Sequence, residues 1–158
     1  MDDLALARAL HVLGVVVWIG GVAMVTAVVL PAIRRRELGA DQLGAFKAIE
    51  GRFTWWARAS VLLVGATGIY MTAGFDLWDR FRSAEFWWMH AMVLVWLTFA
   101  VILFVAEPLF LHRRFEAWAA RQPDVAFARL EKGHWVLLVL SLLTVFGAVA
   151  GSHGWTLG

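Results

Sequence analysis

The stretch "LARALHVLGVVVWIGG", residues 6–21, opens an apolar run that continues almost unbroken to Ile33. A helix needs about 20 predominantly apolar residues to cross the hydrocarbon core of a bilayer, so this run is long enough to span it. The run also contains His11, although an ionisable side chain is costly inside hydrocarbon and is usually functional there. The stretch therefore predicts a transmembrane helix whose imidazole has a functional role.

Three further runs of the same kind follow, and together they indicate a membrane protein. The 158 residues are 61% hydrophobic and their mean hydropathy is +0.72, whereas soluble domains are about half apolar. We predict an all-α fold, a four-helix transmembrane bundle that forms a single domain over residues 1–158. The predicted spans are residues 4–33, 53–75, 86–111 and 134–155. Strands of a membrane barrel are excluded, because the runs are too long and too uniformly apolar.

Basic residues are concentrated in two of the predicted loops. Ten lie there, namely Arg34, Arg35, Arg36, Lys47, Arg52, Arg113, Arg114, Arg121, Arg129 and Lys132. The other side has only Arg8, Arg80 and Arg82, so the positive-inside rule predicts that both termini lie on the outer side. We expect a multi-pass protein of the cell (inner) membrane in contact with the lipid bilayer. Because topology explains the pI of about 9.7, we expect no nucleic-acid partner.

Both basic loops also carry segments suited to the membrane surface. Residues 41–53 and 114–133 mix charged, aromatic and aliphatic side chains, which is typical of interfacial helices. The chain has no cysteine, which excludes disulfides, thiolate metal sites and the covalent attachment of c-type haem.

Three histidines fall in the predicted outer leaflet when depth is counted along the helices. His11 lies in the first span, His90 near the start of the third and His153 near the end of the fourth. A rotation of 100° per residue places His11, Gly14, Trp18 and Gly21 on one helical face. The missing side chains of glycine let a flat ligand or another backbone approach that face closely.

Two histidines on facing helices suit a b-type haem, since neutral imidazole is an axial ligand of haem iron. We predict haem b held by His11 and His90, with His153 as a third candidate. Gly14, Gly21 and Trp18 would line the slot, and Arg80 and Arg82 would meet the propionates. One alternative is that these histidines bind only backbone groups or lipid headgroups. Another is copper, because Met89 and Met92 flank His90 and thioether sulfur suits Cu(I).

The inner boundary holds a second, weaker set of candidates. His112 and His134 flank the second basic loop, and His90 and His112 share a helical face if the helix is a regular α-helix. This placement fits two alternatives, a second haem bound by these histidines or histidines that lie at the level of the lipid headgroups. Glu107 in the third span either pairs with Arg58 or relays protons. Pro108 next to it predicts a kink.

The motifs "LHVLGVVVWIGG", "GIYMTAG" and "FWWMHAMVLV" resemble those of the HemJ-type protoporphyrinogen oxidases and the related CopD-like membrane proteins. The resemblance covers the first three predicted helices. It implies b-type haem, with His11, Trp18, Gly21, Trp88 and His90 carried over. The lysine that those oxidases have two places after the second histidine is Met92 here.

These observations lead to a functional expectation with several alternatives. We expect a haem protein that carries electrons, served by a redox partner or a quinone. The resemblance implies as alternatives a membrane oxidase of the protoporphyrinogen oxidase type and a copper transport or resistance protein. The glycine stripes pack helices either within one chain or between chains, so a homo-oligomer stays open.

Overall fold

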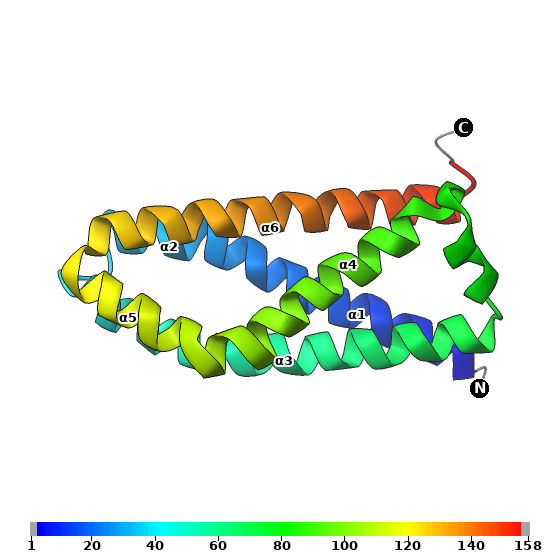
Figure 1. Ribbon diagram of the computed structural model, residues 1–158, viewed down its shortest axis with the longest axis horizontal. Coiled ribbons are helices and arrows are strands. Elements are labelled where there is room, and N and C mark those ends of the chain that lie inside the picture. The colour runs from blue at the N-terminus through cyan, green and yellow to red at the C-terminus, as the bar shows by residue number, and fades with distance from the viewer. Residues whose placement is uncertain (1–2, 156–158) are drawn as a thin grey trace.

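The computed structural model describes residues 3–155 and is all-α over that range, with four long helical rods (Figure 1). The rods are α1 (Asp3–Met24), continued by η1 (Val25–Val29) and α2 (Leu30–Arg34); α3 (Gln42–Gly74); α4 (Trp87–Val101), continued by η4 (Ile102–Leu111) and α5 (His112–Arg121); and α6 (Pro123–Ser152). Two short 3₁₀ helices, η2 (Trp78–Arg82) and η3 (Ala84–Phe86), connect α3 to α4. The predicted all-α, four-helix architecture is confirmed.

Three of the rods are long and apolar enough to cross a membrane: Asp3–Arg34, Ala84–Arg121 and Pro123–Ser152. The remaining predicted span, residues 53–75, falls almost entirely in α3, which is not among them. Arg58 and several glycines and threonines make α3 more polar than its neighbours. Length and composition therefore support a membrane protein with three candidate spans, and a fourth crossing is taken up below as a proposal.

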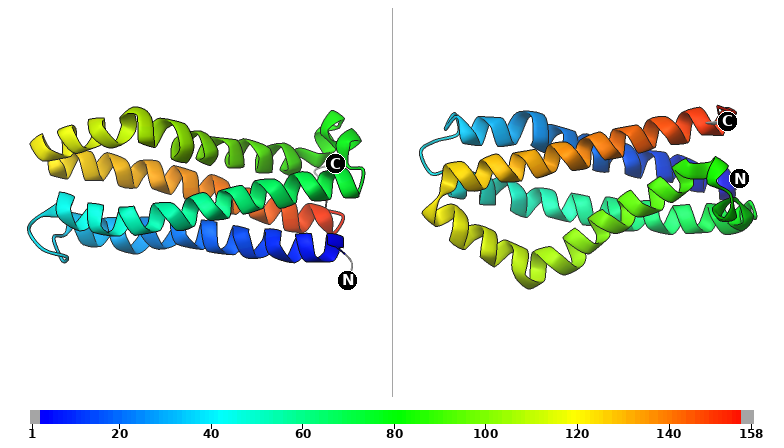
Figure 2. Two further views of the ribbon diagram at one scale, coloured as in Figure 1. Left: turned by 90° about the horizontal axis from the view of Figure 1, so that it is seen from below. Right: turned by 45° about the horizontal axis from the view of Figure 1, so that its top comes forward.

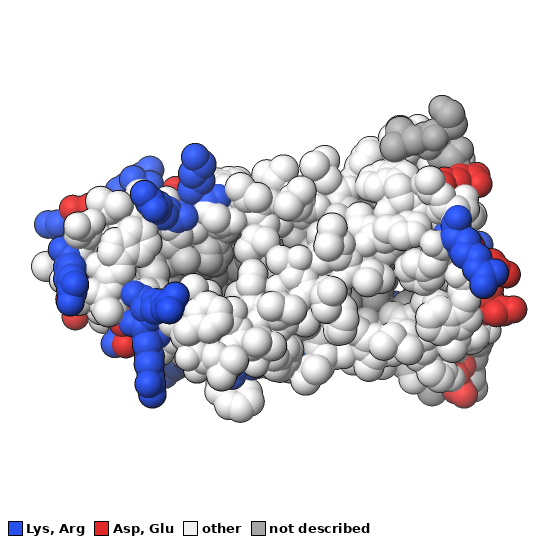
Figure 3. All heavy atoms as spheres, in the orientation of Figure 1, with Lys and Arg blue, Asp and Glu red and all other residues white. Residues whose placement is uncertain are grey.

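The two ends of the bundle differ sharply in charge. Most lysines and arginines gather at the end formed by the loop between α2 and α3 and by the α5–α6 junction (Figure 3). We call this the basic end. The opposite end, which we call the terminal end, holds η2, η3 and both ends of the described chain (Figure 1).

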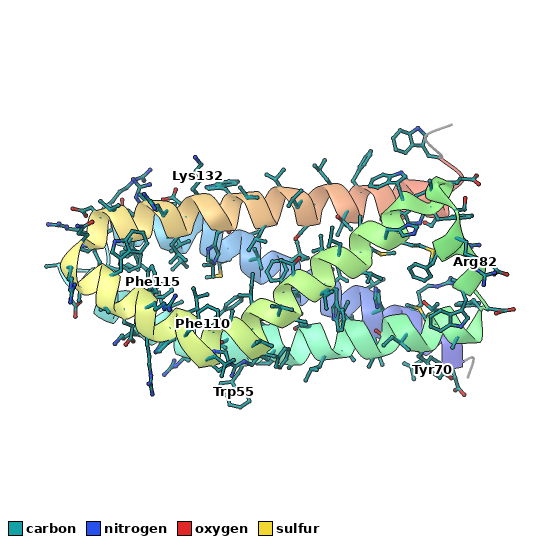
Figure 4. The ribbon with its side chains drawn as sticks, viewed as in Figure 1. Trp55, Tyr70, Arg82, Phe110, Phe115 and Lys132 are labelled. Atoms are coloured by element: carbon teal, nitrogen blue, oxygen red, sulfur yellow. The ribbon has the colours of Figure 1, made fainter. Side chains whose placement is uncertain are left out.

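The surface helices predicted at the basic end are instead parts of the long rods. Residues 42–52 begin α3, and residues 114–133 form most of α5 and the start of α6. They fold against one another because each has an apolar face. Phe46, Phe115 and Phe127 meet in a triad with each pair of ring centroids 5.5 Å apart, and Phe115 points inward between α5 and α6 in Figure 4. A second small core thus extends the bundle beyond the predicted spans.

The turn between α2 and α3 is closed by side chains. Asp41 caps α3 by accepting a hydrogen bond from the backbone N–H of Gly44 at 2.9 Å, which satisfies one of the free donors at a helix start. Gln42 donates from its side-chain amide to the carbonyl of Ile33 at 3.2 Å. Arg36 and Gly39 take positive φ angles of 59° and 114° to reverse the chain.

Along the length of the bundle, α1 packs along α3 and α4 packs along α6 (Figure 2). Glycines in these helices provide space for aromatic rings. A Cβ atom on Gly65 would lie 2.6 Å from Trp96, and one on Gly151 would lie 2.6 Å from Trp88. The ring of Trp87 occupies the space beside Gly147 in the same way. The small-residue stripes of α3 and α6 therefore serve the packing of rings from this same chain.

The third rod changes helical type and bends, as Pro108 predicts. All ten residues of η4 are π-helical, and the axis turns there so that α4 and α5 diverge (Figure 1). A π-helix closes each turn with an i→i+5 hydrogen bond rather than i→i+4. The α-helical count that placed His90 and His112 on one face therefore does not carry across η4.

Candidate functional site

His11 lies half-buried between α1 and α3, about eight residues from the terminal end of the described chain. Its Nδ1 lies 3.0 Å from the hydroxyl oxygen of Thr67. That hydroxyl donates its single proton to the carbonyl of Leu63 at 2.7 Å, so it accepts a proton from His11. Nδ1 is therefore the protonated nitrogen, and the lone pair of the imidazole is on Nε2.

The contact of Nδ1 with Thr67 leaves Nε2 as the candidate ligand atom of His11. The backbone of Val64 is a further hydrogen-bond partner of this side chain. The ring rests on Gly68 of α3, where a Cβ atom would lie 3.4 Å from its Cε1. A fixed tautomer with one exposed lone pair is the arrangement by which proteins prepare a histidine to bind a metal.

His90 is engaged differently. Its Nε2 lies 3.0 Å from the carbonyl oxygen of Phe81 and its Nδ1 lies 3.3 Å from that of Phe86. The imidazole also meets the Phe81 ring edge-on at a centroid distance of 5.7 Å. These contacts hold His90 against the η2–η3 connection, whereas His11 is held against α3. The two imidazoles therefore have no hydrogen-bond partner in common.

The remaining outer candidates lie at the terminal end, near the surface. His153 is exposed and its Nδ1 lies 2.8 Å from the carbonyl of Val149. Arg80 lies over the Phe86 ring at 4.9 Å. Arg82 forms an ion pair with Asp79 at 3.1 Å and points away from the bundle in Figure 4.

The helical face that His11 shares with Trp18 is packed by protein. A Cβ atom on Gly14 would lie 2.8 Å from Val64, and Gly21 is covered by the ring of Phe53. Trp18 is 4% exposed and meets Phe99 edge-on at 5.0 Å. Its indole N–H is buried without a hydrogen-bond partner among the described residues. The glycine face that was predicted to admit a flat ligand is therefore filled by Val64 and Phe53 of this chain.

A second group of functional residues lies at the basic end and begins with Pro108. Proline has no N–H, so one carbonyl a turn earlier loses its helical donor. Arg58 of α3 replaces that donor, because its Nε donates to the carbonyl of Leu103 at 3.1 Å. Its Nη2 also binds Glu107 at 2.7 Å. The predicted pairing of Glu107 with Arg58 is confirmed.

Next to this pair lies a cavity of about 410 Å³ at the junction of α3, η4 and α5. Glu50, Lys47, His112 and Glu116 line it together with Glu107. The Nε2 atom of His112 lies 3.1 Å from Glu116 and its Nδ1 lies 3.9 Å from Glu50. Glu116 in turn forms an ion pair with Lys47. His134, the other histidine predicted at this boundary, does not line the cavity, and its Nδ1 lies 3.0 Å from the carbonyl oxygen of Leu130.

Glu50 accepts no hydrogen bond among residues 3–155, and its contact with His112 at 3.9 Å is long. Burial raises the pKa of the Glu50 carboxyl above its ordinary value, and the nearby charges of Glu107 and Glu116 raise this pKa further. His112 and Lys47 act in the opposite direction. Burial is the largest of these effects because removing a carboxylate from water disfavours its charged form.

Comparisons with known proteins add no family assignment. No family model matches the chain, and neither a curated protein nor a solved structure matches it. The resemblance to HemJ-type and CopD-like proteins therefore stays a prediction, and the function has to be argued from the residues.

Sequence reasoning missed the partners of both sites. Thr67 was not singled out, although it is the residue that fixes the tautomer of His11. Glu50 and Glu116 were placed in surface helices without a role. One local signal was present, because His112 and Glu116 are four residues apart, a spacing at which side chains on an α-helix meet.

Proposed function

We propose that the protein crosses the bilayer four times, with residues 53–75 of α3 as the second crossing and both termini on the outer side. The packing of α1 along α3 supports this, since α3 lies beside a candidate span for most of its length. The location of the positive charges supports the orientation, because the basic end would face the cytoplasm (Figure 3). The polar residues of α3 are compatible with a crossing that is shielded by its neighbours.

We further propose that the protein binds a b-type haem through Nε2 of His11 and acts in electron transfer. The observation that carries this proposal is the contact of Nδ1 with Thr67, which assigns the lone pair of the imidazole to Nε2. Axial histidines of haem proteins need a deprotonated nitrogen toward the iron and a hydrogen bond on the other side. His11 meets both requirements, so the donor set fits the group.

The residues around His11 have separate roles in this proposal. Thr67 fixes the tautomer and orientation of the ring, and Gly68 lets the ring lie flat against α3. When bound, the haem supplies a centre that takes up and releases one electron. His90 would be the second residue to hold the haem, and it would have to give up its contacts with the carbonyls of Phe81 and Phe86.

Absorption spectra of the purified chain in detergent, oxidised and reduced, test this function. We expect a haem b spectrum in the wild type and none in His11→Ala. Thr67→Val should retain the fold but weaken haem binding about 10- to 100-fold, as is typical when the hydrogen-bond partner of a metal ligand is removed.

Thr98→Val is the matched control for the threonine substitution. Thr98 also donates to the carbonyl four residues before it, at 2.8 Å, but it lies on an exposed face of α4 and contacts no histidine. Haem binding by Thr98→Val should equal that of the wild type. A protein without haem after expression with ample haem, or a His11→Ala variant with an unchanged spectrum, would refute the proposal. Bound copper in place of haem would favour the copper alternative.

A further inference from the structure

The cavity at the basic end brings together metal-binding groups from three helical segments. Glu50 comes from α3, Glu107 from η4 and His112 from the start of α5. One ligand atom from each lies within 4.8 Å of the others. Metal ions bind carboxylate oxygen and imidazole nitrogen at about 2.0–2.2 Å, so ligand atoms around one ion lie about 3–4 Å apart and small side-chain rotations would close the group.

The local backbone explains why these groups meet. Within η4 the backbone N–H of His112 bonds to the carbonyl of Glu107, five residues earlier. Residues five apart would point about 140° away from each other in an α-helix, but the i→i+5 turn brings them onto one face. The π-helical segment therefore turns His112 toward the same cavity as Glu107.

His112 faces a carboxylate on each ring nitrogen. Its Nε2 lies 3.1 Å from Glu116 and its Nδ1 lies 3.9 Å from Glu50. When Nε2 donates to Glu116 and the imidazole is neutral, the lone pair is on Nδ1, and either a proton or a metal cation can then occupy the position between Nδ1 and Glu50. This chain of carboxylate, imidazole and open nitrogen is the arrangement that commonly supports a metal ion.

The permanent charges of the cavity leave Glu50 without a counter-ion of its own. Apart from His112, three carboxylates, Glu50, Glu107 and Glu116, face two permanent cations, Lys47 and Arg58. Arg58 binds Glu107 and Lys47 binds Glu116. Glu50 accepts no hydrogen bond among residues 3–155, and the second oxygen of Glu107 is also free. An added cation next to Glu50 would balance the group.

We infer that this cavity binds one divalent first-row transition-metal ion through Glu50, Glu107 and Nδ1 of His112, with Glu116 orienting the imidazole from Nε2. An imidazole combined with carboxylates favours ions such as Zn²⁺ over Mg²⁺. The volume of about 410 Å³ leaves room for water or a small exchangeable ligand on the ion. The site uses none of the residues around His11 and is independent of haem binding.

Calorimetric titration of the full chain in detergent, freed of metal by a chelator, tests this inference. Zn²⁺ should bind with one equivalent of high affinity, and Mg²⁺ should not. Glu50→Gln and His112→Gln should each weaken Zn²⁺ binding by about tenfold or more. Glu50→Gln is the more informative variant, because Glu50 makes no hydrogen bond that the fold depends on.

Glu131→Gln is the matched control. Glu131 lies at the same end of the bundle and pairs with Arg34 at 2.6 Å, but it does not line the cavity. Its Zn²⁺ affinity should equal that of the wild type. The stability of each variant toward detergent unfolding, measured with and without Zn²⁺, checks the same point, because an ion bound to the folded state stabilises it. Unchanged Zn²⁺ binding in Glu50→Gln, equal binding of Mg²⁺, or the same loss in Glu131→Gln would overturn the inference.

Discussion

Replacing Arg58 with methionine should destabilise the protein through two separate contacts. Arg58 donates to the carbonyl of Leu103, which Pro108 leaves without a helical donor, and it pairs with Glu107. The side chains of the ion pair are only 25% and 20% exposed. Methionine keeps the length and apolar stem of the side chain but supplies neither donor.

The expected magnitudes follow from these two contacts. A largely buried ion pair that loses one partner costs about 3–5 kcal/mol, because the other charge stays behind uncompensated. We therefore expect Arg58→Met to lower the free energy of unfolding by about 3 kcal/mol. Adding Glu107→Gln removes the isolated charge and leaves mainly the unsatisfied carbonyl of Leu103, which costs about 1–2 kcal/mol. The double variant should thus be more stable than Arg58→Met alone.

Unfolding by a denaturing detergent, followed by tryptophan fluorescence, measures these free energies. Arg34→Met provides the matched control, because Arg34 pairs with Glu131 at 2.6 Å and the two side chains are 44% and 16% exposed. An ion pair whose cation is exposed to solvent contributes about 0–1 kcal/mol. If Arg58→Met cost no more than Arg34→Met, or if the double variant were the least stable of all, the assignment of Arg58 as both donor and counter-ion would be refuted.

Further predictions concern packing and pH. Gly151→Ala should cost about 1–3 kcal/mol, because its Cβ would lie 2.6 Å from the Trp88 ring; Gly133→Ala, with nothing within 4 Å, should be neutral or slightly stabilising in the same unfolding assay. Phe127→Ala should cost about 3–5 kcal/mol, since Phe127 is 0% exposed in the aromatic triad, and a cost below 1 kcal/mol would contradict a packed core at the basic end. Folding raises the pKa of Glu50, so its charge lowers stability as pH rises from the ordinary carboxyl pKa through the raised one. With metal removed, Glu50→Gln should therefore be more stable than the wild type at pH 7, and this difference should vanish in acid; equal stability of the two proteins across the whole range would contradict a burial-raised pKa.

Much of the fold could be predicted because a bilayer leaves few choices for an apolar run. The first and third predicted spans lie within long apolar rods of the structure, and the fourth does so up to Ser152. The extension of the rods beyond the predicted spans was not predicted. Residues 42–52 and 114–133 carry an apolar face that suits a membrane surface as well as a neighbouring helix, and only the tertiary contacts of Phe46 with Phe115 and Phe127 decide between the two.

The glycine stripes show a similar limit of sequence reasoning. A missing side chain on a helix face signals a close approach, but it does not say what approaches. Gly21 and Gly151 were consistent with a flat ligand, a backbone or a ring, and the structure places Phe53 and Trp88 there. Among the glycines of residues 3–155, only Gly68 lies against His11, where the space is taken by an imidazole.

The two candidate sites differ in how much of their chemistry could be read in advance. His11 is conspicuous because a histidine within an apolar run demands a reason, whereas its partner Thr67 is ordinary and becomes informative only when α1 and α3 are in register. The cavity at the basic end depends on a backbone feature that the sequence does not reveal. Glu107 and His112 share a face only because the helix between them is π-helical and Pro108 is accommodated by Arg58 from another rod. Restoring an α-helical register in η4, for example by deleting one residue of the π segment, would therefore be expected to separate Glu107 from His112 and to abolish the Zn²⁺ site while leaving His11 and Thr67 in contact.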